Sequence, residues 1–236
     1  MVLRFFILAV FLFMSCAEDE RNNSDDEDSK NYVSSSSVSK KSSSSVQVVP
    51  VSCDMNYGTV TIGSQVWMAE NLNCNVSGSK CYDNSEANCA KYGRLYNWAT
   101  AMKLPGCNSK SCASQVGANH QGICPSGWHI PSDAEWTTLT DYVGGDSTAG
   151  KYLKATSGWN SGGNGQDTYG FAALSGGLGS SDGSFYDVGI NGLWWSASES
   201  NAHDAYYRLM GYNYENVLRY SYGKSDLLFS VRCLQD

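Results

Sequence analysis

The sequence predicts one disulfide-stapled globular domain that is dominated by β-strands, with two helices and long loops. Three observations support this prediction. Short aromatic segments separated by glycine recur after residue 46, which is typical of strands joined by loops. One later segment carries a complete helix-start signal. Eight cysteines lie between Cys53 and Cys233, an even number that suits a disulfide framework in an exported domain.

The strands are predicted from short runs of β-branched, aromatic and aliphatic residues that are bounded by turn-forming residues. They are Thr59–Ile62, Val66–Ala69, Leu193–Ala197, Ala205–Met210, Val217–Tyr220 and Leu228–Leu234. The stretch Ser157–Gly165 is so rich in glycine, serine and asparagine that neither helix nor strand is expected there.

The clearest helix begins at Ser132. Ser132 and Glu135 have the spacing of a capping box, in which each side chain bonds the backbone N–H of the other. The apolar residues that follow recur at helical spacing, which predicts a buried face made of Trp136, Leu139, Tyr142 and Val143. A second helix is predicted over Tyr96–Met102.

Residues 1–15 have the features of a lipoprotein signal peptide. Arg4 precedes ten apolar residues, Phe5–Met14, a run too short to span a bilayer. Ser15 then precedes Cys16, the position that such signals diacylate before it becomes the new N-terminus. We therefore predict lipidation at Cys16. The alternative is an ordinary signal peptide with an unrelated cysteine.

Residues 16–49 are predicted to form a disordered tether, and residues 50–236 the folded domain. Seven of the twelve residues in Ala17–Asp28 are acidic, and Ser34–Ser45 offers almost nothing to bury. The formal charge of −7 comes without a clustered basic face, which argues against a nucleic-acid partner. Acidic residues directly after Cys16 resemble a surface-display signal of some bacteria. The expected location is therefore the outer membrane or cell surface, facing the periplasm or the extracellular space.

The eight cysteines that remain after Cys16 are expected to form four disulfides. Cys81 and Cys89 flank a short polar span, as do Cys107 and Cys112, so both pairs are predicted as local bridges. A zinc site is the alternative use of cysteines. No two of them have the two-residue spacing of a zinc knuckle, and we predict no metal or other cofactor.

Seven ordered motifs resemble those of a known family. They are QVWMAENL at 65–72, CYDN at 81–84, YGRLYNW at 92–98, CPSGWHIPSDAEW at 124–136, YGF at 169–171, WSASE at 195–199 and SVRC at 230–233. In this order they resemble the Fibrobacter succinogenes major paralogous domain, a bacterial cell-surface module, over residues 53–236.

The resemblance implies an α+β, C-type lectin-like fold, in which two helices pack on a small antiparallel sheet and long loops cluster on one side. Such domains bring their chain ends together. If the local bridges hold, this favours Cys124–Cys233 as the closing bridge and leaves Cys53 to pair with Cys74. The competing arrangement joins Cys53 directly to Cys233, and it stays open.

No catalytic constellation is predicted. His129 lies in an apolar segment before a helix, where a hydrogen-bonded structural histidine is expected, and His203 lies in a polar loop where we expect it to be solvated. Phosphate-binding loops and hydrolase motifs do not occur. Segment 128–136 resembles part of the formylglycine-generating enzymes, but their reactive late cysteines have no counterpart in Leu193–Gly223.

Loop carboxylates and amides offer oxygen atoms of the kind that Ca²⁺ prefers. Two groups stand out, Asn164, Asp167, Asp182 and Asp187 in one, and Glu199, Asn201 and Asp204 in the other. Neither has EF-hand spacing, and the tripeptides that mark sugar-binding Ca²⁺ in lectins do not occur. Turn formation is therefore the expected role.

The aromatic residues give the best argument for binding, because sugars present C–H faces that stack on Trp and Tyr rings. Trp159 lies between flexible residues, and Tyr212 and Tyr214 flank Asn213 in a predicted hairpin tip. These three aromatic residues are the candidate ligand-binding residues. The other tryptophans are expected in the core, namely Trp67, Trp98, Trp128, Trp136, Trp194 and Trp195.

The predicted function is a non-enzymatic, lipid-anchored surface module that binds an extracellular ligand, either a polysaccharide or another surface protein. One alternative is an enzyme or accessory factor acting on cell-envelope or plant-wall carbohydrate. That alternative requires converging carboxylates or a perturbed histidine in a cleft. The other alternative is a structural surface-coat protein, with neither such a cleft nor an exposed aromatic patch.

Overall fold

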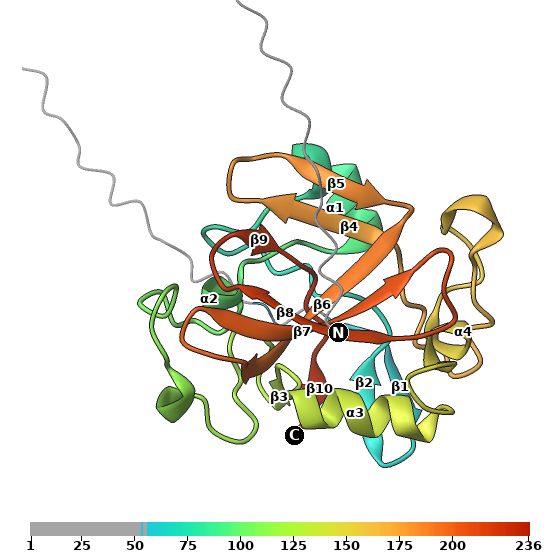
Figure 1. Cartoon of the computed structure of the whole chain (residues 1–236), viewed down its shortest axis with the longest axis horizontal. Helices are drawn as coiled ribbons and strands as arrows, with labels where there is room; N and C mark the ends of the chain where they lie inside the picture. The colour runs from blue at the N-terminus through green and yellow to red at the C-terminus, as the bar shows by residue number, and fades with distance from the viewer. Residues whose placement is uncertain (1–52, 54–55) are drawn as a thin grey trace, which may run out of the picture. The chain divides into compact units, whose positions relative to one another are not determined.

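The computed structural model describes Cys53 and residues 56–236, and this part of the chain is mostly β (Figure 1). It contains two sheets and four short α-helices. Within these ranges no helix is both long and apolar enough to cross a bilayer. The predicted signal peptide, the lipidation site Cys16 and the tether lie outside the described residues.

The smaller sheet joins strands from both ends of the domain. Its strands are β1 (Thr59–Ile62), β2 (Gln65–Met68), β3 (Trp128–His129) and β10 (Leu234–Gln235). The order is β1-β2-β10-β3, and every pair is antiparallel. Leu234 pairs with both Trp67 and His129, so the last strand lies between the first hairpin and the segment that leads into the main helix.

The larger sheet follows the order β5-β4-β6-β7-β8, and β9 also pairs with β4. Its strands are β4 (Gly176–Ser180), β5 (Phe185–Val188), β6 (Asn191–Glu199), β7 (Asp204–Gly211), β8 (Leu218–Gly223) and β9 (Leu227–Leu228). All pairs are antiparallel except β4 with β6. Figure 1 shows that the sheet is curved, and β8 forms one of its edges.

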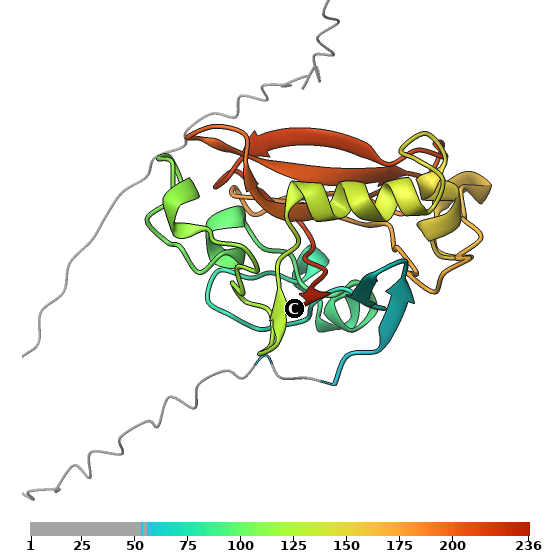
Figure 2. The same cartoon turned by 90° about the horizontal axis from the view of Figure 1, so that it is seen from below.

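The helices are α1 (Glu86–Tyr92), α2 (Trp98–Ala101), α3 (Asp133–Tyr142) and α4 (Ala149–Leu153), with 3-10 turns at Tyr82–Asn84, Ala113–Gln115 and Asn160–Gly162. Helix α3 runs along one face of the large sheet (Figure 2). The predicted capping box between Ser132 and Glu135 is confirmed. The predicted helix face is buried except for Tyr142, which is 58% exposed because it lies over Gly63 and Tyr169 instead of the core.

The expected C-type lectin-like α+β layout, with two helices on a small antiparallel sheet, is wrong. Two sheets dominate the described chain, and only α3 reaches ten residues. The predicted helix over Tyr96–Met102 shrinks to the four residues of α2. Tyr96 forms a β-bridge with Phe229, and the side chain of Asn97 caps the helix, so helical geometry begins later than expected.

Five of the predicted strands are found where expected, as β1, β2, β6, β7 and β8. The sixth, Leu228–Leu234, divides into β9 and β10 around an irregular segment. Strands β4 and β5 are missing from the sequence prediction, because glycines interrupt the side-chain pattern of β4. Gly179 lies against the Phe185 ring, and Gly177 has a φ of 69°, so close approach and backbone conformation explain these glycines.

Two hydrophobic clusters fill the interior on opposite sides of β6. Trp194 and Trp195 are neighbours on this strand and therefore point to opposite faces. Trp195 packs in the cluster with Trp98 and Phe229, whereas Trp194 packs in the cluster with Trp67, Trp136 and Phe171. Of the six tryptophans predicted in the core, only Trp128 is not fully buried.

All four predicted disulfides are present, namely Cys53–Cys74, Cys81–Cys89, Cys107–Cys112 and Cys124–Cys233. The competing Cys53–Cys233 bridge is therefore wrong. Cys124–Cys233 spans 109 residues, and closing such a loop stabilises a domain by roughly 4–5 kcal/mol in the chain-entropy model. Disulfides of this number indicate an extracellular or secreted domain.

A buried arginine joins the two sheets. Arg232 lies two residues before β10, and its Nε and Nη2 donate to Asn71 Oδ1 at 3.1 and 2.7 Å. Trp194 Nε1, on β6, donates to the same oxygen at 2.8 Å. Arg232 Nη1 donates to the Phe171 carbonyl, and the Phe171 ring lies 4.3 Å from the guanidinium. One amide oxygen therefore serves three donors.

This guanidinium is held without a direct carboxylate partner among the described residues. Burial lowers the pKa of Arg232 to about 9, and the more distant charges of Asp167 and Glu70 oppose that shift. The group remains charged at neutral pH. Its stability in the interior therefore depends on neutral acceptors and on the Phe171 ring.

Asn71→Ala should lower the free energy of unfolding by roughly 3 kcal/mol or more, because it leaves the Arg232 guanidinium and the Trp194 N–H without their shared acceptor. Urea unfolding followed by tryptophan fluorescence measures the loss. The control is Asn108→Ala in an exposed loop, which should change the stability by less than about 0.5 kcal/mol. A similarly small effect of Asn71→Ala would contradict the role given to Asn71.

Candidate functional site

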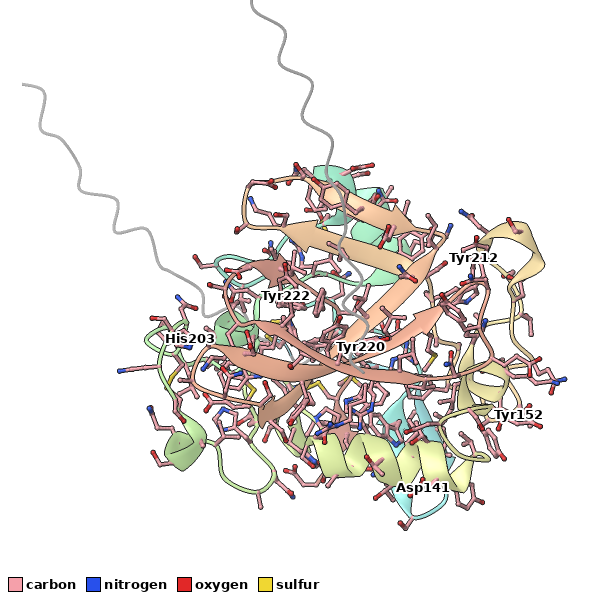
Figure 3. All side chains as sticks on the ribbon, viewed as in Figure 1. Asp141, Tyr152, His203, Tyr212, Tyr220 and Tyr222 are labelled. Atoms are coloured by element: carbon pink, nitrogen blue, oxygen red, sulfur yellow. A yellow bond between two sulfur atoms is a disulfide. The ribbon has the colours of Figure 1, made fainter. Side chains whose placement is uncertain are left out.

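A pocket opens where the loop around Asn160–Gly162 meets the turn between β7 and β8. It has a volume of about 280 Å³ and is lined by Lys154, Ser161, Gly162, Gly163, Asn164, Tyr212, Asn213, Tyr214 and Glu215. We call it the tyrosine pocket. Figure 1 shows the end of the β7–β8 hairpin beside the loop that follows α4, and Figure 3 labels Tyr212 there.

Glycine allows the two sides of the pocket to approach each other. A Cβ atom at Gly163 would overlap the backbone of Tyr212, so only glycine fits there. The Tyr212 N–H donates to the Ile190 carbonyl at 2.8 Å, and the Tyr214 N–H donates to the Gly211 carbonyl at 3.3 Å. These backbone bonds fix the turn that carries both tyrosines.

Lys154 supports the pocket from the inside. It is buried, and its Nζ donates to the carbonyls of Gly211 and Tyr214 at 3.0 and 2.8 Å. The same ammonium lies 5.1 Å from the centre of the Trp159 ring. Burial lowers the pKa of Lys154, and the nearby charge of Glu215 opposes this shift. The lysine therefore holds the tyrosine-bearing turn in place.

The three predicted ligand-binding residues lie close together, but only two face the pocket. Tyr214 is 47% exposed and Tyr212 is half-buried, and both line it. The expectation of an exposed Trp159 ring is wrong, because this residue is only 5% exposed. Its Nε1 donates to the Ala173 carbonyl, and its backbone N–H donates to Asn164 Oδ1. The glycine-rich loop thus folds over the ring.

The sequence pattern does not single out Lys154, Ser161 or Glu215, and it presents Asn164 only as a calcium candidate. Lysine and serine are common on surfaces, so nothing local marks a lysine that folding will bury. The one usable signal is the glycine content of residues 157–165. It indicates a loop that can approach another backbone closely.

A second pocket, with a volume of about 260 Å³, contains a histidine and a carboxylate, His120 and Glu135. His120 Nε2 lies 2.8 Å from the Met102 carbonyl. Glu135 accepts hydrogen bonds from the backbone and hydroxyl of Ser132 through one oxygen, and its other oxygen lies 3.1 Å from His129 Nε2. The carboxylate is therefore already bound within the fold.

His129 links the start of α3 to the end of the chain. It is buried, and its Nδ1 lies 2.8 Å from Asp236 Oδ1. Burial alone lowers the pKa of His129, but the hydrogen bonds to Glu135 and Asp236 and their charges outweigh it, so the pKa is raised. Burial opposes ionisation of Glu135, yet hydrogen bonds from His129 and Ser132 lower its pKa to about 2.

As predicted, His129 is hydrogen-bonded and His203 is exposed. An ionised Glu135 with both oxygens occupied is a poor proton donor near neutral pH. The pair therefore fits a structural role as a latch between α3 and Asp236.

The loop carboxylates considered for Ca²⁺ make other contacts. Glu199 pairs with the buried Lys224 at 2.8 Å, whereas Asp204 accepts from the amide of Asn201. The residues of the glycine-rich group accept separate local hydrogen bonds, namely Asn164, Asp167, Asp182 and Asp187. One cluster of possible metal ligands was found in the described chain, Cys81, Glu86 and Cys89, but its cysteines are joined in a disulfide.

Residues 60–235 match the Fibrobacter succinogenes major domain. The chain belongs to this family. Comparisons with curated proteins and with solved structures found no match. Several of the motifs by which the chain resembles the Fibrobacter succinogenes major domain contribute buried residues, including Asn71, Trp98, Phe171, Trp195 and Arg232. The tyrosine pocket lies outside these motifs.

The pKa shifts of the latch predict how stability depends on pH. Because the pKa of His129 is raised in the folded chain, protonated His129 contributes to the free energy of unfolding. This contribution is complete below about pH 6.5, the pKa of histidine in the unfolded chain, and is lost as the pH rises through the pKa of His129 in the folded chain. Because the pKa of Glu135 is lowered, ionised Glu135 also contributes to the free energy of unfolding. This contribution is present above pH 4.5 and is lost as the pH falls toward about 2. The latch should therefore stabilise most between these limits.

Urea midpoints at mildly acidic and mildly alkaline pH measure this effect. The unaltered chain should lose stability on going to alkaline pH, and His129→Gln should reduce that loss. His203→Gln serves as the control, because it removes an exposed histidine that lies outside the latch. If the urea midpoint of His129→Gln changed with pH as much as that of the unaltered chain, the latch would not titrate as described.

Proposed function

We propose that the domain is a non-enzymatic surface module that binds an extracellular saccharide through the tyrosine pocket. The observation that carries this proposal is the combination of two tyrosine rings with amide and hydroxyl groups in one concave site. Sugars present C–H faces to aromatic rings and hydroxyls to polar groups. Binding sites for small ligands commonly combine apolar walls with a few oriented polar groups.

The residues of the pocket supply both kinds of contact. Tyr212 and Tyr214 offer ring faces, while Asn164, Asn213 and Ser161 offer amides and a hydroxyl. The bond from the Trp159 N–H to Asn164 Oδ1 orients that amide before a ligand arrives. Preorganised polar groups lower the entropy lost on binding.

The remaining surface supports the same class of ligand. Among the described residues, the strongly exposed large hydrophobic side chains are all tyrosines, Tyr142, Tyr186, Tyr214, Tyr220 and Tyr222. A tyrosine joins a flat apolar ring to a hydroxyl, which suits a ligand that alternates C–H faces with hydroxyls. An apolar peptide or a lipid would be better matched by exposed leucine, isoleucine or methionine.

The alternatives of an enzyme and of a surface-coat protein become outcomes of the binding test. An enzyme needs a carboxylate or histidine that is available to substrate, and Glu135 in the second pocket is bound to His129 and Ser132. A coat protein would bind none of the saccharides offered.

Binding is tested by exposing the full-length chain, in detergent, to cellulose, xylan, chitin and peptidoglycan, followed by affinity measurements with short fragments of the polymer retained. Tyr212→Ala and Tyr214→Ala should each weaken fragment binding about fivefold to tenfold, as expected for the loss of roughly 1 kcal/mol of ring contact. The matched control is Tyr142→Ala, an exposed tyrosine on α3. Unchanged affinity in both pocket variants would overturn the assignment.

We also propose that Cys16 is lipidated and that the domain is tethered to the outer membrane or cell surface. The apolar run Phe5–Met14 and the Ser15–Cys16 junction support this proposal. Cys16→Ala should move the protein from the membrane fraction to the soluble fraction, and metabolic labelling with a fatty acid should fall to background. Unchanged membrane partitioning and labelling would remove the lipid anchor from the proposal.

A further inference from the structure

A second group of tyrosines lies away from the pocket, on the larger sheet. In the register of β7 and β8, Tyr207 is opposite Tyr220 and Ala205 is opposite Tyr222. Directly paired residues point to the same face of a sheet, and so do residues two apart on one strand. Tyr207, Tyr220 and Tyr222 therefore share one face, and Figure 3 labels the last two beside each other along β8.

Along β6, β7 and β8 this face carries one ionic side chain, Glu199, which lies opposite Ala205. Its side chain is only 6% exposed and pairs with the buried Lys224 at 2.8 Å. The other paired residues on this face are Leu193 and Trp195 on β6, Ala205, Tyr207 and Leu209 on β7, and Leu218, Tyr220 and Tyr222 on β8. The arginines of the hairpin lie on the opposite face, where Arg208 and Arg219 both bond Asp133 of α3. One face of the hairpin thus makes an ionic contact with α3, and the exposed side chains of the other face form an uncharged tyrosine surface.

The tyrosine surface rests on the core. The Tyr207 ring lies 4.8 Å from the Phe229 ring and 6.0 Å from the Trp195 ring, and both of these residues are fully buried. The Tyr220 ring lies 6.1 Å from that of Tyr207 on its outer side. Aromatic contacts therefore run without interruption from the interior to the surface, which fixes Tyr207 and limits the entropy lost when a ligand binds.

The outer end of this row is open to a ligand. Tyr220 and Tyr222 are 49% and 45% exposed on β8, an edge strand of the sheet. None of the three hydroxyls makes a hydrogen bond with another group in the part of the chain that the structure describes. Burial raises the pKa of Tyr207 to about 12, and the neighbouring Tyr220 and Tyr222 add to this shift, so the hydroxyl stays protonated.

We propose that Tyr207, Tyr220 and Tyr222 form a platform on which an extended, uncharged polysaccharide chain stacks. This proposal rests on the proposed function only for the chemical class of the ligand, because the platform shares no residue with the tyrosine pocket. Alternate residues of a strand recur about every 6.8 Å, and cross-strand rings lie at a similar spacing. That spacing is of the same order as one sugar residue, so successive rings can meet successive sugars.

The absence of an exposed charge on the tyrosine surface selects among polymers, since Glu199 and Lys224 are buried and paired with each other. A uronic acid polymer would need a cation to offset its carboxylates, and neither Arg208 nor Arg219 points to this side of the sheet. A peptide added to the edge of β8 would depend on backbone hydrogen bonds instead of the ring faces. Ring removal therefore separates a stacked saccharide from an added peptide strand.

The test is native affinity electrophoresis of the full-length chain in gels containing soluble xylan, hydroxyethylcellulose or, as the charged polymer, polygalacturonate. At least one neutral polymer should retard the unaltered chain. Tyr220→Ala combined with Tyr222→Ala should weaken this retardation tenfold or more. Tyr220→Trp should preserve it, and Tyr220→Leu should not, because stacking needs a flat ring. Tyr142→Ala should behave like the unaltered chain.

Thermal unfolding of each variant shows that the fold is intact. Normal retardation of the Tyr220→Ala, Tyr222→Ala double variant would overturn the platform, as would retardation by polygalacturonate alone or by no polymer. The pocket is judged separately, from short fragments and the Tyr212 and Tyr214 variants. If the Tyr220→Ala, Tyr222→Ala double variant still binds short fragments, the proposed function stands. If this double variant loses retardation by the polymer and the Tyr212 and Tyr214 variants bind fragments normally, the platform alone is supported.

Discussion

The fold depends on burying one positive charge without a carboxylate beside it. Arg232 is tolerated because Asn71 Oδ1, the Phe171 carbonyl and the Phe171 ring surround its guanidinium. Asn71 follows β2 and Arg232 precedes β10, whereas Trp194, which shares the same acceptor, belongs to β6. The contact thus joins the small sheet to the large one. Since an unpaired buried donor costs more than the bond itself contributes, the three groups have little freedom to separate.

The disulfides act on the same region. Cys233 is the residue after Arg232, and its bridge to Cys124 ties the end of the chain to the segment before β3. His129 on β3 then contacts both Asp236 and the first turn of α3. The arginine, the disulfide and the latch therefore secure one short C-terminal segment by three different interactions. This explains why β10, a strand of only two residues, can occupy a central position in the smaller sheet.

Local chemistry determined what the sequence could predict. The capping box, the two short disulfide loops and the strands β6 and β7 were predicted from neighbouring residues or from short aromatic and aliphatic runs, and these predictions were confirmed. The second helix of the lectin-like layout is shorter than predicted because Tyr96 forms a bridge with Phe229, far away in sequence. The prediction of an exposed Trp159 was wrong for a similar reason, because the glycine-rich loop around it folds over its ring. Burial of Lys154 likewise depends on carbonyls some sixty residues later.

Both proposed binding surfaces belong to the same hairpin. The turn between β7 and β8 carries Tyr212 and Tyr214, and β8 carries Tyr220 and Tyr222. Asp133 holds this hairpin from behind through Arg208 and Arg219, and the hydrogen bonds from these arginines lower the pKa of that carboxylate even though burial opposes the shift. Because Asp133 is in the first turn of α3, the helix that caps itself through Ser132 also anchors the hairpin. The buried motifs thus provide the support on which the exposed tyrosines of the hairpin rest.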